Sequence, residues 1–274
     1  MAVFSDTLHF PQSNHFLPYN RFELRDCLGL DTPDRKYYAI AFDAAANGAD
    51  DDASSFNIGP LTVGTGGANR LLVVGVSLLD TTLGDRQVGT VEWRRGASGT
   101  QSLTQAIEID NPNNHAEIWY LVAPTTGAGT VFVDTAGVVS GPVGGAISYT
   151  GVDQTSPIDA IASGTGAGTL ISGTITTIAD NAWIVDNVSR AATGAGTMTA
   201  ATGRTQRWNR LDSPFSEAPR SMASDQGAIS PAGATVMQWT GGSQVWAWTA
   251  ISLAPAAEAG GEVSKGNLLL LGVG

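Results

Sequence analysis

Short runs of apolar residues recur along the chain from about residue 38 to residue 255. In many of them apolar and polar positions alternate, as between Thr169 and Ile178, and this is the period of a half-buried β-strand. The residues between the runs are mainly Gly, Pro, Asn and Asp, which favour turns. No stretch combines helix caps with a 3.6-residue period over three turns. The pattern therefore predicts a nearly all-β protein.

The run Arg70–Leu79 is apolar at nearly every position, and the run Ala182–Val188 is predicted to be a buried strand. An unbroken apolar run is typical of a central strand that is buried on both faces. The other predicted strands span residues 38–43, 87–94, 102–109, 116–123, 129–134, 145–151, 169–178, 196–200, 204–210, 220–225, 234–239 and 245–253. Strands of about 5–8 residues with this spacing predict two packed antiparallel sheets of about six or seven strands each, a β-sandwich or jelly roll.

Glycine-rich stretches interrupt the strand pattern at Gly64–Gly67 and Gly164–Gly168. Neither opens a helix, so neither has the strand–loop–helix context of a phosphate-binding loop, and both are predicted to be turns. No internal repeat of fixed period is evident. The predicted sandwich spans residues 38–255, because Pro255 removes a ladder donor and ends the last strand.

The first 37 residues lack this periodicity and are predicted to form an extended N-terminal arm. The arm is rich in aromatic side chains, which anchor well in the grooves of a protein surface. We expect them to contact neighbouring subunits or to fold back onto their own sandwich, and both alternatives stay open. The candidate interface aromatics are Phe4, Phe10, Phe16, Tyr19 and Phe22.

Residues 256–274 are predicted to form a flexible linker and a short apolar C-terminal tail. Four consecutive leucines lie near the end, and burying one leucine side chain is worth about 1.5–3 kcal/mol. A free apolar end therefore favours a partner surface. The candidate interface leucines are Leu268, Leu269, Leu270 and Leu271.

The composition combines a low charge content with an acidic balance. Charged residues make up 14% of the chain, the formal net charge is −11, and lysine occurs only at Lys36 and Lys265. Nucleic acids and anionic membranes need clustered cations, so neither is an expected partner. The chain has no transmembrane run of about 18 apolar residues and no signal peptide at its start. A surface rich in Thr, Ser, Asn and Gly nevertheless suits an exposed particle, and a virion is the expected location.

Four segments carry a family resemblance: residues 69–77, 116–124, 145–158 and 246–255. In these strand and turn signatures the chain resembles β-sandwich domains of the lectin-like, concanavalin-like jelly-roll group, found in phage virion structural proteins and bacterial surface proteins. The resemblance covers roughly residues 55–255. It implies a sandwich fold and a role in assembly or display, and it carries no catalytic residue.

Two of the seven tryptophans lie beside arginines, Trp93 next to Arg94 and Trp208 next to Arg207. These two are the candidates for exposure, as a subunit contact or as a platform for a sugar ring. The other five lie inside apolar runs and are predicted to be core residues: Trp119, Trp183, Trp239, Trp246 and Trp248.

No catalytic residue, metal site or cofactor is predicted. Glu108 and Asp110 resemble half of a glycosidase carboxylate pair, but the usual pattern is broken after Asp110, and Glu117 falls on the next strand. The acidic run Asp50–Asp52 lacks the further oxygen ligands of a calcium loop and is predicted to be solvated. The single cysteine, Cys27, excludes an intrachain disulfide and is predicted to be a small buried residue.

These observations favour a non-enzymatic phage virion structural protein, such as a capsid decoration (cement) protein or another outer component. Its partners would be other copies of itself and other virion proteins, with host-surface glycan as a further candidate. A carbohydrate-binding adhesin is the alternative, and a glycoside hydrolase is the third hypothesis.

Overall fold

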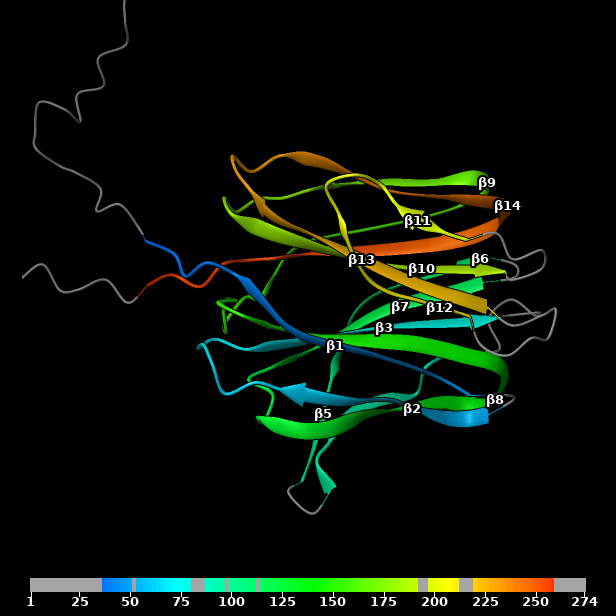
Figure 1. Cartoon of the computed structure of the whole chain (residues 1–274), viewed down its shortest axis with the longest axis horizontal. Helices are drawn as coiled ribbons and strands as arrows, with labels where there is room; N and C mark the ends of the chain where they lie inside the picture. The colour runs from blue at the N-terminus through cyan, green and yellow to red at the C-terminus, as the bar shows by residue number, and fades with distance from the viewer. Residues whose placement is uncertain are drawn as a thin grey trace, which may run out of the picture. The chain divides into compact units, whose positions relative to one another are not determined.

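The structure is a computed structural model, and it describes residues 36–50, 53–79, 87–96, 99–111, 114–191, 197–211 and 219–258. These residues form an all-β body of two antiparallel sheets (Figure 1). The first sheet holds β1 (Ala41–Ala49), β2 (Ala53–Val63), β3 (Leu71–Leu79), β4 (Thr90–Arg94), β5 (Thr100–Ser102), β6 (Thr104–Asn111), β7 (Asn114–Val122) and β8 (Gly127–Thr150). The second holds β9 (Ile158–Thr176), β10 (Ala182–Ala191), β11 (Thr199–Ala200), β12 (Thr205–Leu211), β13 (Pro219–Ile229) and β14 (Ala234–Leu253).

The first sheet folds over itself along its longest strand, β8. The beginning of β8 pairs with β2 and β4, and its end pairs with β1 and β3. Between the two parts lie Gly137 and Gly141, both with positive φ angles that suit glycine. The strands in the order β1–β8–β3–β7–β6 thus form a central layer, and β2, β4 and β5 form an outer layer with the start of β8.

The second sheet repeats this plan around β14. Residues 234–240 of β14 pair with β9 and β11, whereas residues 244–253 pair with β10 and with the other part of β9. The register between β14 and β9 shifts between Thr240 and Gln244, across Gly241 and Gly242. The end of β14, β10, β13 and β12 form the second central layer.

Three apolar clusters separate the layers. An aliphatic cluster around Leu72, Val74 and Val76 fills the fold of the first sheet. A cluster with Trp239 and Trp248 fills the fold of the second. The third joins the two central layers, and it includes Val73 of β3 and Val185 of β10. Strands β3 and β10 thus face an apolar cluster on each side. This confirms the prediction that Arg70–Leu79 is buried on both faces and that Ala182–Val188 is a buried strand.

The N-terminal half (residues 36–153) and the C-terminal half (residues 154–258) match each other in register. Leu72 pairs with Ser148 in the first sheet, and Ile184 pairs with Ser252 in the second. The two serines lie in the same tripeptide, Ala-Ile-Ser. A β-bulge occurs at Asp43 in β1 and at Asp159 in β9, opposite these serines.

The turns of the two halves match as well. Asn69 and Asn181 precede β3 and β10 with φ angles of 56° and 62°. Ala123 and Ala228 have φ angles of 49° and 48° at equivalent places, after β7 and near the end of β13. The two bulge aspartates are 116 residues apart in the sequence, whereas the two serines opposite them are 104 residues apart. A repeat whose period drifts in this way leaves no fixed period in the sequence.

Several features differ from the predictions. The predicted strands 129–134 and 145–151 are parts of the single strand β8, and 234–239 and 245–253 are parts of β14. The strand β2 is additional, and its sequence contains Pro60. The stretch Gly164–Gly168 is not a turn, because it lies within β9 and pairs with residues 244–248 of β14. Small side chains are needed there, since a Cβ at Gly166 would overlap the indole of Trp246.

Candidate functional site

Both ends of the described chain leave the body side by side. Tyr37 and Ala257 form an antiparallel bridge. The Tyr38 amide donates to the Ala256 carbonyl at 2.7 Å, and the Glu258 amide donates to the Lys36 carbonyl at 2.7 Å. We call this region the terminal pole, made of residues 36–42 and 255–258 with the neighbouring residues Asn181, Trp183 and Ala228 (Figure 1).

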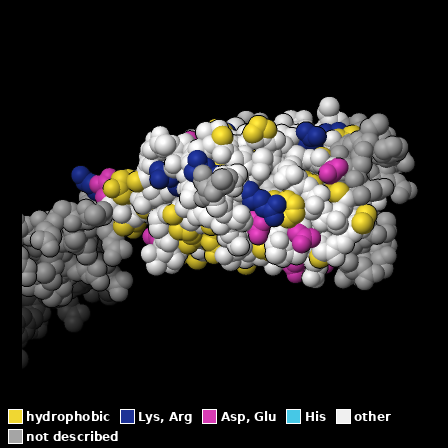
Figure 2. Space-filling view, turned by 90° about the horizontal axis from the view of Figure 1, so that it is seen from below, with side chains coloured by type: hydrophobic (Ala, Val, Ile, Leu, Met, Phe, Trp, Pro, Cys, Tyr) yellow, Lys and Arg dark blue, Asp and Glu magenta, His cyan; other side chains and the backbone are white. Residues whose placement is uncertain are grey.

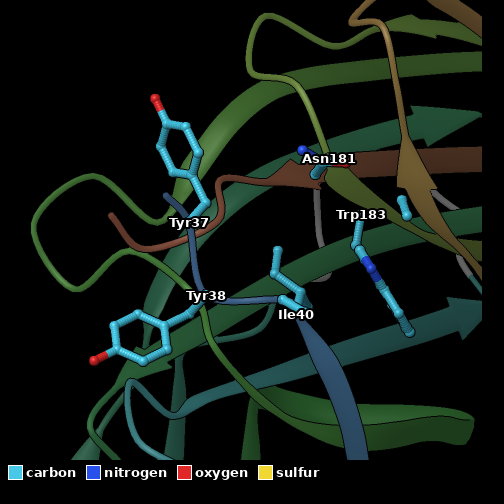
Figure 3. A pocket seen from close by; sticks show the side chains of 7 residues that line it. Tyr37, Tyr38, Ile40, Asn181 and Trp183 are labelled. Atoms are coloured by element: carbon cyan, nitrogen blue, oxygen red, sulfur yellow. The ribbon is translucent and has the colours of Figure 1, made fainter. Parts of the chain in front are cut away.

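An open pocket of about 350 Å³ lies at the terminal pole. Figure 3 shows the rings of Tyr37 and Tyr38 pointing in different directions from the strand that leads into β1, with Ile40 and Trp183 behind them. The two tyrosines are 41% and 42% exposed, which is high for aromatic side chains. The pocket therefore offers aromatic surface at the place where the chain enters and leaves the body.

A row of aromatic contacts leads from the surface to the pocket. Arg207 lies over the ring of Phe42, 3.7 Å from its centroid. The edge contacts continue from Phe42 to Tyr149, with centroids 6.5 Å apart, and from Tyr149 to Trp183, with centroids 5.8 Å apart. Such pairs add to the apolar burial of their rings. They join β1 and β8 of the N-terminal half to β10 and β12 of the C-terminal half.

One buried carboxylate holds this row in place. Asp225 accepts hydrogen bonds from the Tyr149 hydroxyl at 2.8 Å and from Arg207 Nε at 2.6 Å. Burial and the charge of Asp225 raise the pKa of Tyr149 well above its usual value, so the phenol stays protonated and remains a donor. The terminal pole is therefore a rigid platform with exposed rings on its outside.

The predicted interface residues of the arm and the tail lie outside the described residues. These residues are Phe4, Phe10, Phe16, Tyr19, Phe22, Leu268, Leu269, Leu270 and Leu271. The same holds for Cys27, Asp51 and Asp52. Asp50 is exposed, and its amide donates to the Pro142 carbonyl at 3.1 Å.

The prediction that Trp93 and Trp208 are exposed is wrong. Trp93 is fully buried in the aliphatic cluster of the first sheet, and its indole N–H donates to the Thr125 carbonyl at 3.0 Å. Trp208 is 3% exposed and lies between the central layers. It packs where Gly75 and Gly145 leave room, since a Cβ at Gly145 would overlap its ring. The neighbouring Arg94 is exposed, with 42% of its side chain accessible, whereas Arg207 is mostly buried against Asp225.

Glu117 lies on the strand after that of Glu108, as predicted. Strands β6 and β7 form a hairpin that places these two residues directly opposite each other. Glu117 is nevertheless fully buried and accepts hydrogen bonds from Trp119 and Gln105, so a sugar cannot reach it. The pair does not favour a glycosidase.

Comparisons of the chain with protein-family models, with curated proteins and with solved structures found no match. The described part of the chain holds no helical segment that could serve as a membrane span. The site must therefore be interpreted from its own geometry. The terminal pole was missed at the sequence level, because Tyr37 and Tyr38 come together with Asn181 and Trp183 only through the pairing of distant strands.

Proposed function

We propose that this protein is a structural component of a phage virion, a capsid decoration protein or another outer-surface component. It is attached through the segments that extend from its terminal pole, and it presents the rest of the sandwich to the outside. The observation that carries this proposal is the pairing of Tyr37 with Ala257, which brings together Lys36 and Glu258, the described residues that adjoin the predicted arm and tail. Two apolar segments that start together can engage one partner surface with a combined affinity above that of either alone.

The surface of the body supports the same proposal. Figure 2 shows that charged side chains are scattered over the face in view and that most of this face is neither charged nor apolar. Exposed aromatic side chains instead occur at the terminal pole, at Tyr37, Tyr38 and Phe42. Attachment at the pole would bury the aromatic surface and leave the mainly polar surface of the body in contact with water.

The test uses the full chain and a double variant, Leu269→Asp with Leu270→Asp. We expect the wild type to self-associate in sedimentation velocity runs and to be present in purified virions by mass spectrometry. The double variant should be monomeric and absent from virions, because two charges in the tail remove its apolar contact. Leu170→Asp is the matched control, since Leu170 is 49% exposed on β9 of the body. A monomeric wild type, or normal incorporation of the double variant, would contradict the proposal.

Carbohydrate binding is the second proposal. Because the candidate tryptophans are buried, the pocket at the terminal pole is now the candidate sugar-binding surface. Exposed tyrosine rings beside an amide, here Tyr37 and Tyr38 with Asn181, provide a stacking surface and polar groups for a sugar. Tyr38→Ala should then weaken the binding of a glycan found by array screening at least tenfold. Ile178→Ala, at a residue that is 75% exposed, should not change it. Equal binding by Tyr38→Ala would exclude this surface.

A further inference from the structure

The hairpin of β6 and β7 brings polar and charged side chains together at the end of the body away from the terminal pole. Strand β3 starts near the pole at Leu71 and ends at Leu79, and His115 of β7 lies opposite Leu78. A register shift between Gln105 and Ile107 changes the alternation in β6. As a result, Gln105, Glu108 and Asp110 lie opposite Trp119, Glu117 and His115.

His115 is held between two carboxylates. Its Nδ1 contacts Asp110 and its Nε2 contacts Glu117, and both contacts are short. The ring is therefore fixed in place, with Nε2 directed at the buried Glu117.

Three hydrogen-bond donors besides His115 orient the Glu117 carboxylate. Its Oε1 accepts the Val88 amide at 3.2 Å, and its Oε2 accepts Trp119 Nε1 at 2.5 Å and Gln105 Nε2 at 3.1 Å. The Gln105 amide also donates to Glu108 at 2.9 Å. Hydrogen bonds that orient ligand side chains in this way are a regular feature of metal sites.

The charges of the cluster do not balance. Glu108 and Glu117 are like charges directly opposite each other, which destabilises a sheet. Among the described residues, the ion pairs of Asp110 and Glu117 are both with His115. Three carboxylates therefore gather around one imidazole ring, and a bound cation would be favourable at this place.

We propose that Glu108, His115 and Glu117 bind a divalent transition metal ion of the Zn²⁺ type. One ligand atom from each residue lies within 4.8 Å of the others. The metal takes the place of the proton between His115 Nε2 and Glu117, and Asp110 accepts from the other ring nitrogen, as in the carboxylate–histidine–zinc arrangement. An imidazole with two carboxylates suits Zn²⁺, whereas Ca²⁺ prefers oxygen ligands alone.

The site is reachable at one ligand. Glu108 is exposed, whereas His115 and Glu117 are fully buried. A metal bound there would tie the edge strand β6 to β7 and so stabilise the end of the body that the proposed attachment leaves free.

The test measures Zn²⁺ binding by the full chain after treatment with EDTA, in competition with a chromophoric chelator. We expect Glu108→Gln to weaken the binding at least tenfold and Asp110→Asn to weaken it about 10–100-fold, the usual effect of losing an outer partner of a ligand. Glu258→Gln is the control, because it removes the same charge from an exposed residue at the terminal pole. Zn²⁺ should also raise the melting temperature of the wild type and of this control.

Other histidines in the chain can also bind Zn²⁺. The proposal is therefore tested by the difference in Zn²⁺ affinity between the variants and the wild type. Equal Zn²⁺ affinity of the wild type and Glu108→Gln would overturn the proposal, and so would the absence of binding. Binding of Ca²⁺ in preference to Zn²⁺ would overturn the choice of metal class. Because Glu108→Gln removes a like charge opposite Glu117, it should melt no lower than the wild type in EDTA, so that a loss of affinity reports the ligand itself.

Discussion

The N-terminal and C-terminal halves share one backbone plan but fill it differently. Val74 of β3 and Asp186 of β10 are at equivalent places, opposite Ala146 and Ala250. Val74 joins an aliphatic cluster. Asp186 is buried instead under Trp239 and Trp248, whose indole N–H groups lie 2.9 and 3.4 Å from its carboxylate. The fold thus depends on register, bulges and turns more than on the chemistry of any one core position.

The halves diverge again at the end away from the terminal pole. Leu78 pairs with His115 in the N-terminal half, and Arg190 pairs with Arg220 at the equivalent place in the C-terminal half. Burial lowers the pKa of both arginines, and the charge of Arg220 adds to this effect at Arg190. One half therefore places an acidic cluster at this end and the other places a basic pair. Two similar frameworks can thus place different chemical groups at equivalent strand ends.

The largest expected effect comes from the side chain that joins the halves. Trp208→Ala should lower the free energy of unfolding by about 4 kcal/mol, because a buried indole is lost and the glycines opposite it cannot fill the space. The halves should then unfold less cooperatively, with a van't Hoff enthalpy below the calorimetric one. Trp93→Ala, within one half, should cost a similar amount in calorimetry. Unchanged two-state unfolding of Trp208→Ala would show that this side chain does not couple the halves.

The next effect depends on pH and on the buried carboxyl of the C-terminal half. Burial raises the pKa of Asp186 from 3.8 to about 6, although donors from Trp239, Ser224 and Trp248 oppose it. Between these values the folded chain holds a proton that the unfolded chain has lost, so stability falls as the pH rises. In urea titrations, the free energy of unfolding of the wild type minus that of Asp186→Asn should thus fall by about 2–3 kcal/mol from pH 4 to pH 7.

Val74→Ala is the matched control for this measurement. It changes the equivalent place in the N-terminal half and removes no titrating group. Its stability difference from the wild type should be the same at both pH values. A constant difference for Asp186→Asn as well would contradict the assignment of the pH effect to this carboxyl.

A smaller effect compares the two bulge aspartates. Asp43 accepts the Gly64 amide at 2.8 Å, and Asp159 accepts the amides of Ile178 and Ala179 at 2.7 and 3.0 Å. Each also accepts a serine hydroxyl. Asp43→Ala should cost about 1.5 kcal/mol and Asp159→Ala about 1 kcal/mol more, because it loses one further charge-assisted bond. Urea unfolding of both variants and of the double variant should give additive costs, and a larger cost at Asp43 would contradict the comparison.

The smallest effect concerns the paired left-handed turns. Ala123→Gly and Ala228→Gly should each stabilise the protein by about 0.5 kcal/mol, since glycine removes the strain of a positive φ but is freer in the unfolded chain. Asn69→Gly should change little, because asparagine tolerates this conformation. Thermal melting of the three variants checks the order. Destabilisation by only one alanine variant would show that the two turns are not equivalent.

The sequence was sufficient for the fold class and for its central strands. Unbroken apolar runs such as Arg70–Leu79 can only be stable when both faces are covered, and this requirement is local in the sequence. It could not show that Gly164–Gly168 belongs to a strand, because the glycine at position 166 is needed to make room for Trp246 of the distant strand β14. Nor could the sequence predict that Trp93 and Trp208 are buried, since the space for them is made by residues far away in the chain.

Local pattern determined that this chain forms strands, where most of them lie and which of them are central. The tertiary structure alone decided which side chains meet: the exposed rings at the terminal pole, and Glu108, His115 and Glu117 on one hairpin. The physical reason is that alternation encodes burial residue by residue, whereas contacts depend on register, and a bulge at one residue, as between Gln105 and Ile107, moves every later side chain to the other face.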